Sequence, residues 1–432
     1  MRSPLLNLAA LAVVLILSGC NTASNMGREV GGWFRTDNTG RPVGSRTASN
    51  VNNAPATENG VQNAGEEVPQ AVPSTAVTSA PLDGTLPSSG PTPSNKVLST
   101  IKVGLLLPLS GKNAAMGKSF QDAAQMAVND LSADNFELIP KDSGMTANET
   151  ARAVNDAMSE GAQMIIGPVF SDRVSDVKSV INGRVPVLTL SNDANVAGGN
   201  TYVLGFSPAQ QVTRALQYAG SKGIHNIAIL APSSIYGDIA VNAATASGIT
   251  IVETQRYTSD KPSIKKAVAA ISARRGDVQA ILLPDGGAAL GNVAAELTAV
   301  ALSAHDIPII GTGLWDSFGD GQNVQQYNVL VGGYFAAPDP AARAKFVSRY
   351  QKVYGSKPTR LATLAYDATA LAAVLAKQGR TYDDASLTDP NGFAGLDGIF
   401  RLNAMGVAER GLAILEVTPT GAKVVDASPK SF

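Results

Sequence analysis

The chain has 432 residues, with 34 Lys and Arg against 35 Asp and Glu, two His and one Cys. A net charge of -1 argues against a nucleic-acid-binding protein, because such a surface needs clustered positive charge to neutralise phosphates. One cysteine excludes an internal disulfide and a multi-cysteine metal site, and His225 and His305 are too few for a histidine metal centre. We therefore expect no metal, no cofactor and no nucleic-acid partner.

Residues 1–20 predict a secretory signal, with Arg2 near the start and an apolar run from Leu5 to Leu17 that is too short to span a bilayer. Its end, Leu17-Ser18-Gly19-Cys20, resembles the lipobox of bacterial lipoproteins, in which the signal is cut before a cysteine that becomes lipidated. The resemblance implies lipidation at Cys20 on the periplasmic face of the cell envelope. Asn21, where an Asp favours the inner membrane, points to the outer membrane. The alternative is an ordinary signal peptide that contains a cysteine.

Residues 21–97 predict a disordered tether. They contain no Ile, no Tyr and only two Leu, while Ser, Thr, Asn, Gly, Ala and Pro dominate. A segment of this composition buries too little apolar surface to offset the entropy lost on ordering.

From Ile101 onward, short and almost wholly apolar runs alternate with segments of helical period. The runs lie at residues 101–107, 164–166, 185–188, 227–230, 280–283 and 307–310. Continuous apolar runs of this length are typical of strands in a parallel sheet that is buried on both faces. Between them, apolar residues recur at three- and four-residue spacing, as in Met116, Phe120, Ala124 and Ala127. Strand and helix in alternation predict an α/β fold with βαβ units.

Several strands end at a proline, as in Leu107-Pro108 and Leu283-Pro284. Ligands of open α/β sheets bind at the carboxyl ends of the strands, so the loops after these strands form the candidate site. One such loop is similar to a phosphate-binding loop, but five residues instead of four separate Gly111 from Gly117. No nucleophile and base can be paired from the sequence, so we expect a protein that is not an enzyme.

The region from about residue 100 to the C-terminus resembles the type I periplasmic binding proteins of the leucine/isoleucine/valine-binding lineage. The resemblance lies in IKVGLLLPLSGKNAAMGKSFQDAAQMAVND, AQMIIGPVFSDRV, ILAPSSIYGD and YGSKPTRLATLAYDATALA. Two further segments, YVLGFSPAQQVTRALQYA and GFAGLDGIFRLNAMGVAERGLAILEV, are similar to lipoproteins called penicillin-binding protein activators. The resemblance implies a domain at 98–432 with two lobes, each a parallel sheet flanked by helices, around a ligand cleft. We expect lobe 1 at about 98–205 and 338–380, and lobe 2 at about 206–337 and 381–432.

The resemblance also implies which residues bind the ligand. Ser171, after Gly167-Pro168, corresponds to a serine that meets a ligand carboxylate, and acids in the second lobe would pair with an ammonium group. The expected ligand-binding residues are Ser110, Ser171, Ser191, Asn192, Asp193, Tyr236, Asp285 and Asp316. The alternative for Ser171 is a helix N-cap, and that for Ser191 and Asn192 is a role in turns. Met116 stands where importer receptors often carry an aromatic residue, which argues against a branched-chain amino acid as the ligand.

Two functions remain open at this point. In the first, the domain binds a small amino-acid-like solute and presents it to the permease of an ABC importer. In the second, the domain is an outer-membrane lipoprotein that activates a peptidoglycan synthase, a penicillin-binding protein. The derived features describe a ligand cleft, which favours the first, whereas the anchor and the long tether favour the second.

Overall fold

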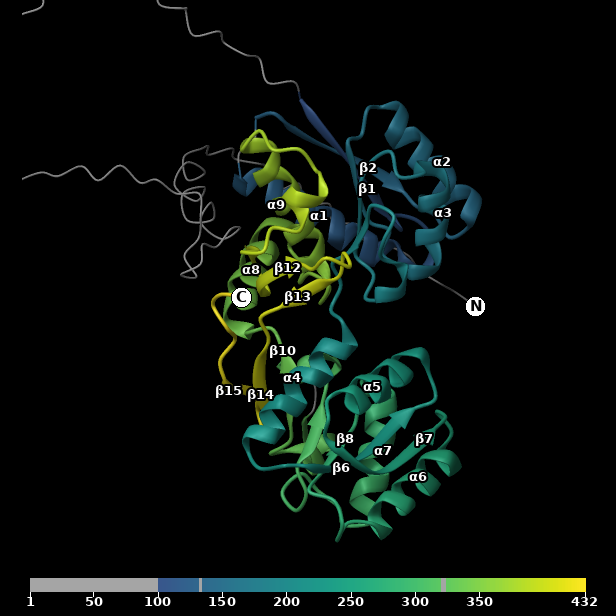
Figure 1. Cartoon of the computed structure of the whole chain (residues 1–432), viewed down its shortest axis with the longest axis vertical. Helices are drawn as coiled ribbons and strands as arrows, with labels where there is room; N and C mark the ends of the chain where they lie inside the picture. The colour runs from purple at the N-terminus through teal and green to yellow at the C-terminus, as the bar shows by residue number, and fades with distance from the viewer. Residues whose placement is uncertain (1–99, 132–133, 320–323) are drawn as a thin grey trace, which may run out of the picture. The chain divides into compact units, whose positions relative to one another are not determined.

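The computed structural model describes residues 100–131, 134–319 and 324–432, and Figure 1 shows how their helices and strands are arranged. The predicted signal, Cys20 and the whole of the predicted tether lie outside the described residues. Within the described part, no helix is both long and apolar enough to cross a membrane.

The first lobe is built on a parallel sheet of five strands in the order β2-β1-β3-β4-β5. The strands are β1 (Ile101–Leu107), β2 (Phe136–Asp142), β3 (Met164–Ile166), β4 (Val187–Thr189) and β5 (Thr201–Val203). On one face lie α2 (Ala147–Ser159) and α3 (Ser171–Ile181), whose Val154 and Val177 pack against Ile165 of β3. The other face is covered by α1 (Ala114–Leu131), α8 (Pro340–Tyr354) and α9 (Ala362–Lys377).

The second lobe contains a sheet of seven strands in the order β15-β14-β10-β9-β8-β6-β7. Five strands are parallel: β6 (Asn226–Pro232), β7 (Thr250–Tyr257), β8 (Ala280–Leu282), β9 (Ile309–Gly311) and β10 (Tyr334–Ala337). The C-terminal strands β14 (Ala413–Thr418) and β15 (Gly421–Asp426) extend this sheet in antiparallel fashion. One face packs on α4 (Pro208–Ser221) and α5 (Ile235–Ala246), and the other on α6 (Lys261–Ala273) and α7 (Gly287–Ala299).

The predicted α/β class is confirmed, and all six apolar runs contain or overlap strands. The strands that the sequence analysis missed include β2 and β7, which lie at the edges of their sheets. Edge strands expose one side to solvent, and β2 accordingly mixes polar with apolar residues in Phe136-Glu137-Leu138-Ile139-Pro140-Lys141-Asp142. Such a pattern lacks the continuous apolar run by which the central strands were recognised.

The segment 381–410 differs from its predicted assignment to the second lobe. Its strands β11 (Phe393–Gly395), β12 (Gly398–Leu402) and β13 (Ala408–Arg410) form a separate antiparallel sheet. Phe393, Phe400 and Leu402 are buried in the core of the first lobe with residues of α1 and α9. The third crossing between the lobes therefore lies between β13 and β14. The physical reason is that the apolar side chains of this segment bury against α9, a long-range contact that no local pattern indicates.

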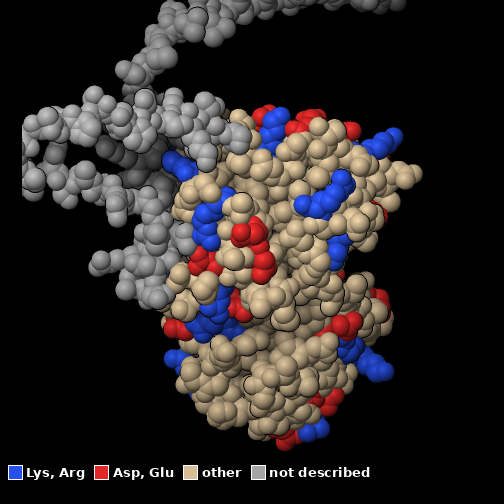
Figure 2. Space-filling model, turned by 45° about the horizontal axis from the view of Figure 1, so that its top comes forward, with Lys and Arg blue, Asp and Glu red and all other residues tan. Residues whose placement is uncertain are grey.

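Charged side chains of both signs are interspersed on the molecular face that Figure 2 draws. No extended patch of one sign is seen on that face, in keeping with the net charge of -1. Within residues 100–131, 134–319 and 324–432, no group of three or more His, Cys, Asp or Glu side chains is placed to hold a metal ion.

Candidate ligand-binding cleft

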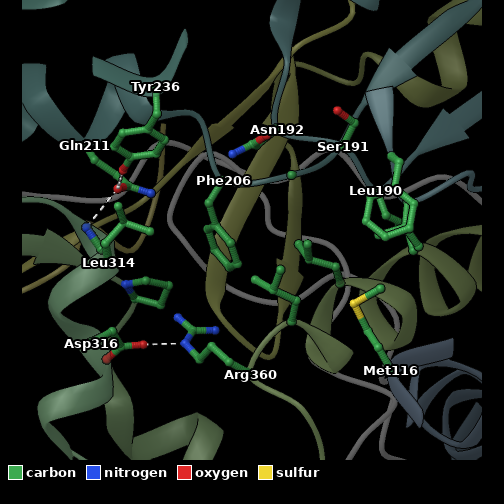
Figure 3. A pocket seen from close by; sticks show the side chains of 17 residues that line it. Met116, Leu190, Ser191, Asn192, Phe206, Gln211, Tyr236, Leu314, Asp316 and Arg360 are labelled. Atoms are coloured by element: carbon green, nitrogen blue, oxygen red, sulfur yellow. Dashed lines mark hydrogen bonds and ion pairs between the residues drawn. The ribbon is translucent and has the colours of Figure 1, made fainter. Parts of the chain in front are cut away.

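A cavity of about 460 Å³ lies where the strand-exit loops of both sheets meet. Its walls come from loops after β3, β4, β5, β9 and β10, from the starts of α1, α4, α5 and α9, and from the segment that joins α8 to α9. Met116, Val169, Phe170, Leu190, Ser191, Asn192, Gly205, Phe206, Gln211, Tyr236, Gly313, Leu314, Asp316, Pro338, Arg360, Leu361 and Leu364 line it (Figure 3). Most of these side chains are apolar, with a few polar groups among them, which is the usual composition of a small-molecule site.

Two strand-exit loops of the first lobe hold each other in place at the cavity. The Gly205 N–H donates to the Ser191 carbonyl at 3.0 Å. A Cβ atom at position 205 would lie 2.2 Å from that same oxygen, so only glycine permits the approach. The contact fixes the positions from which Ser191, Asn192 and Phe206 reach the cavity.

Four of the eight predicted ligand-binding residues line the cavity: Ser191, Asn192, Tyr236 and Asp316. Ser191 is buried, and its Oγ accepts a hydrogen bond from the Asp193 N–H at 3.1 Å. Ser191 therefore also has the role in a turn that was its alternative. The Tyr236 hydroxyl donates to Thr312 Oγ1 at 2.9 Å. Burial raises the pKa of Tyr236 to about 12, so at neutral pH the hydroxyl is protonated.

The other four predicted residues lie outside the cavity lining and have local structural roles. Ser110 is an exposed residue that hydrogen-bonds the carboxylate of Asp142. Ser171 is the first residue of α3, whose N-cap position is taken by Phe170, so the alternative of a Ser171 N-cap is wrong. Both serines lie close to the ends of strands, as expected, but neither is among the residues that line the cavity.

The two remaining acids already accept hydrogen bonds, Asp193 within its own loop and Asp285 both from its own loop and from the end of β7. Asp193 caps a short 3-10 helix and accepts from the Asn195 N–H at 3.0 Å. Asp285 accepts from the Tyr257 hydroxyl at 2.7 Å and from the Gly286 N–H at 2.8 Å. Neither carboxylate lines the cavity, so the expectation that these acids face a ligand ammonium is not met in this arrangement.

An arginine–aspartate cluster forms one wall of the cavity. Asp316 is only 7% exposed, and its Oδ2 accepts from Arg343 at 2.7 Å and from Arg360 at 2.5 Å. Arg343 lies on α8 and Arg360 between α8 and α9, so these two bonds join the second lobe to the first. The dashed line in Figure 3 marks the bond to Arg360.

Phe206 extends this cluster towards the interior of the first lobe. The guanidinium carbon of Arg360 lies 5.2 Å from the centre of its ring, and that of Arg410 lies 4.5 Å from it. Both distances are within the range of cation–π attraction. Arg410 is itself buried beside Asp367, and its guanidinium donates to the Leu204 carbonyl at 2.8 Å.

The predicted ligand-binding residues did not include four polar or aromatic residues of the lining, namely Phe170, Phe206, Gln211 and Arg360. Phe206 and Gln211 follow β5, a strand of three residues whose Thr201-Tyr202-Val203 is too short and too polar to stand out as an apolar run. The rule that ligands bind at strand ends, applied to this strand, would have found Phe206. Arg360 lies in the segment between two helices, and no local signal marks it.

Comparisons with known proteins agree with this architecture. Residues 100–421 match the sequence model of the periplasmic binding protein family. Among curated proteins, the penicillin-binding protein activator LpoA of Vibrio cholerae is 26% identical over 176 residues, which is 39% of this chain and 28% of that protein. The matches span less than half of the length of the first curated relatives.

Solved structures with the same fold include two that were determined with small molecules. LivJ of Streptococcus pneumoniae, a branched-chain amino acid transporter substrate-binding protein in complex with isoleucine, has a TM-score of 0.56 at 21% identity, covering 76% of this chain and 100% of that one. A solute-binding protein of an ABC transporter from Rhodopseudomonas palustris, in complex with 3,4-dihydroxybenzoic acid, has a TM-score of 0.56 at 20% identity, covering 77% and 98%.

The family is one of binding proteins, which supports the expectation of a protein that is not an enzyme. The family match covers most of the chain, including every strand except the last, β15, and every residue that lines the cavity. The chain therefore belongs to the periplasmic binding protein family.

Proposed function

We propose that the protein is a solute receptor of the cell envelope that binds a small organic acid in the cleft between its lobes. The observation that carries this proposal is the cavity of about 460 Å³, which is largely apolar and has a few polar side chains at defined places. The ligands named for LivJ and for the Rhodopseudomonas palustris protein are both small carboxylic acids, which supports the same class here. An ABC permease is the partner that this function requires.

The test is a thermal-shift screen of the full chain, purified in detergent, against amino acids, aliphatic and aromatic carboxylates, peptides and muropeptides. A ligand at a hundredfold excess over its Kd stabilises the folded state by about 2.7 kcal/mol. We expect at least one small organic acid to raise the melting temperature. The proposal fails if no solute does so at millimolar concentration.

Membrane attachment through Cys20 is part of the same proposal. The Leu17-Ser18-Gly19-Cys20 sequence supports it, and acyl chains contribute roughly 0.8 kcal/mol per buried CH₂. Residues 21–97 would then hold the domain away from its membrane, with the outer membrane favoured by Asn21.

The anchor is tested by membrane fractionation of the Cys20→Ala variant. We expect the protein to move from the membrane pellet to the soluble fraction, whereas the control Asn21→Ala keeps the cysteine and stays in the pellet. Retention of Cys20→Ala in the pellet would contradict lipid anchoring.

The second candidate function is activation of a peptidoglycan synthase, which the partial similarity to LpoA favours. In this function the domain binds a penicillin-binding protein, and the cleft is regulatory or unused. Pull-down from envelope extracts separates the two candidates. Retention of a penicillin-binding protein by a domain that no solute stabilises would support the activator, and solute binding without that partner would support the receptor.

A further inference from the structure

We infer that the cleft selects a carboxylate with an apolar body and discriminates against solutes that carry an ammonium group. The inference rests on the proposed function, because it names the ligand class of the same cavity. It follows from the hydrogen bonds and ion pairs that the charged and polar side chains of the cavity already make.

Asp316 is the one acid among the described residues that line the cavity, and two arginines hold it. Its Oδ2 accepts from Arg343 at 2.7 Å and from Arg360 at 2.5 Å, and the side chain is 7% exposed. A ligand ammonium that used this carboxylate would have to displace a guanidinium from a nearly buried bond. It would also enter beside two positive charges, which repel it.

The face of an aromatic ring is the other common place for an ammonium group. Phe206 is the ring at the centre of this cavity in Figure 3. The guanidinium groups of Arg360 and Arg410 already lie 5.2 Å and 4.5 Å from its centre. A third cation against this ring would meet like charge, so the ring does not supply an ammonium site.

Hydrogen-bond donors, by contrast, are presented to the cavity. Gln211 Oε1 accepts from the Gly313 N–H at 2.8 Å, which fixes the amide orientation because an NH₂ group cannot accept that bond. The Nε2 group is therefore the donor of this amide, and Gln211 is one of the residues that line the cavity. Ser191 Oγ accepts from the Asp193 N–H, which leaves its own hydrogen to be donated.

Arg360 is the cation of the cavity lining, and it is planar with five N–H donors. Arg360 already donates through Nε to Asp316, so a carboxylate that enters the cavity would share this guanidinium with Asp316. Apolar walls such as Met116, Leu190 and Leu314 take up the rest of the ligand. The described lining residues thus offer a ligand hydrogen-bond donors and a guanidinium group. Their one carboxylate, that of Asp316, is already paired with two arginines. This arrangement favours an anion over a zwitterion as the ligand.

Matched ligand pairs test this selectivity directly. The full chain in detergent is titrated with isoleucine against 3-methylpentanoate, and with phenylalanine against 3-phenylpropanoate, so that the two members of each pair differ in the ammonium group alone. We expect at least one of the acids to bind about tenfold or more tightly than its amino-acid partner. Equal or tighter binding of the amino acids overturns the inference.

The same titration distinguishes a failure of this inference from a failure of the proposed function. If the amino acids bind and the plain acids bind no more tightly than they do, the inference falls and the receptor stands. If no solute of the wider panel binds, both fall.

Variants then assign the role of the residues. Arg360→Gln is expected to weaken binding of the preferred acid by about tenfold or more, since it removes the cation of the lining. Arg343→Gln is the matched control, because Arg343 also pairs with Asp316 but does not line the cavity; its affinity should stay within about threefold. Equal losses in the two variants would contradict a direct role for Arg360.

Gln211→Glu provides a second test that does not depend on removing an arginine. The new carboxylate can still accept from the Gly313 N–H, and it replaces a donor with an acceptor in the cavity lining. We expect this variant to lose affinity for the acid and to gain affinity for the matching amino acid. An unchanged preference in a folded Gln211→Glu protein, checked by circular dichroism, would overturn the inference.

Discussion

Asp367 on α9 is a fully buried carboxyl group whose surroundings change its protonation. Its Oδ1 accepts from the Leu396 N–H at 2.8 Å, and Arg410 and Asp397 are the charged groups that act on it. Burial raises the pKa of Asp367 from its ordinary value of 3.8 to about 7, although Arg410 opposes this rise. A carboxyl group of this kind makes stability depend on pH near neutrality.

The Asp367→Asn variant is predicted to remove this dependence. Between about pH 4 and about pH 7 the folded chain keeps a proton that the unfolded chain has released, so the free energy of unfolding falls as pH rises through that window. The stability of the wild type minus that of Asp367→Asn should therefore decrease from about pH 4 to about pH 7 and stay level above it. Urea unfolding at a series of pH values measures the difference.

Asp260→Asn is the matched control. Asp260 is an exposed N-cap residue of α6, and the hydrogen bond from the Thr258 hydroxyl lowers its pKa below the ordinary value. The Asp260 carboxylate stabilises the folded state at pH values above its ordinary pKa, and this stabilisation is lost only as pH falls below that pKa. The stability of the wild type minus that of Asp260→Asn should therefore stay level from about pH 4 to about pH 7. If the stability of the wild type minus that of Asp367→Asn rises or stays level from about pH 4 to about pH 7, burial does not raise the pKa of Asp367.

At the scale of single elements, α2 begins with a complete capping box. Thr146 Oγ1 accepts from the Glu149 N–H at 3.3 Å, and Glu149 Oε2 accepts from the Thr146 N–H at 2.9 Å. These two bonds satisfy backbone donors that have no partner within the helix.

Thr146→Ala is predicted to lower the free energy of unfolding by about 1 kcal/mol, because the helix loses its N-cap acceptor. Thr146→Ser keeps the hydroxyl and should remain close to the wild type. Urea unfolding of the two variants at one pH checks this. If they are equally stable, the cap does not contribute to stability.

Helix α9 and the strands show why some elements were easier to predict than others. The central strands are buried on both faces, so each leaves a continuous apolar run in the sequence. In α9, 14 residues from Ala362 to Ala376 are buried, and the helix is apolar on nearly every side. Its composition indicates burial, but not that the segment 381–410 packs in the same core.

At the scale of the whole molecule, Asp316 links the two lobes. It follows β9 of the second lobe, whereas its partners Arg343 and Arg360 belong to the helical segments that pack on the first. Removing the carboxylate leaves two largely buried guanidinium groups without the anion they share. Charged hydrogen bonds of this kind are each worth about 1.5 to 3 kcal/mol.

Asp316→Asn is therefore predicted to lower the free energy of unfolding by about 2 to 3 kcal/mol in the ligand-free protein. The control is Asp238→Asn, which removes an exposed carboxylate paired with Arg256 inside the second lobe and should cost at most about 1 kcal/mol. Urea unfolding followed by the fluorescence of buried Trp315 and by circular dichroism compares them. Equal losses would mean that the bridge between the lobes adds nothing beyond an ordinary surface pair.

The sequence by itself determined the α/β class, six of the strands (β1, β3, β4, β6, β8 and β9) and the loops after them as the place of a ligand site. It could do so because burial on both faces and strand–helix alternation leave local patterns. It also placed Ser191, Asn192 and Tyr236 in loops that do line the cavity. Only the tertiary structure decided that Asp285 accepts from Tyr257 at the end of β7, and that Arg360 and Phe206 join Asp316 at the cavity. These groups are far apart in the chain, and their contacts follow from the packing of the two lobes, which no local pattern encodes.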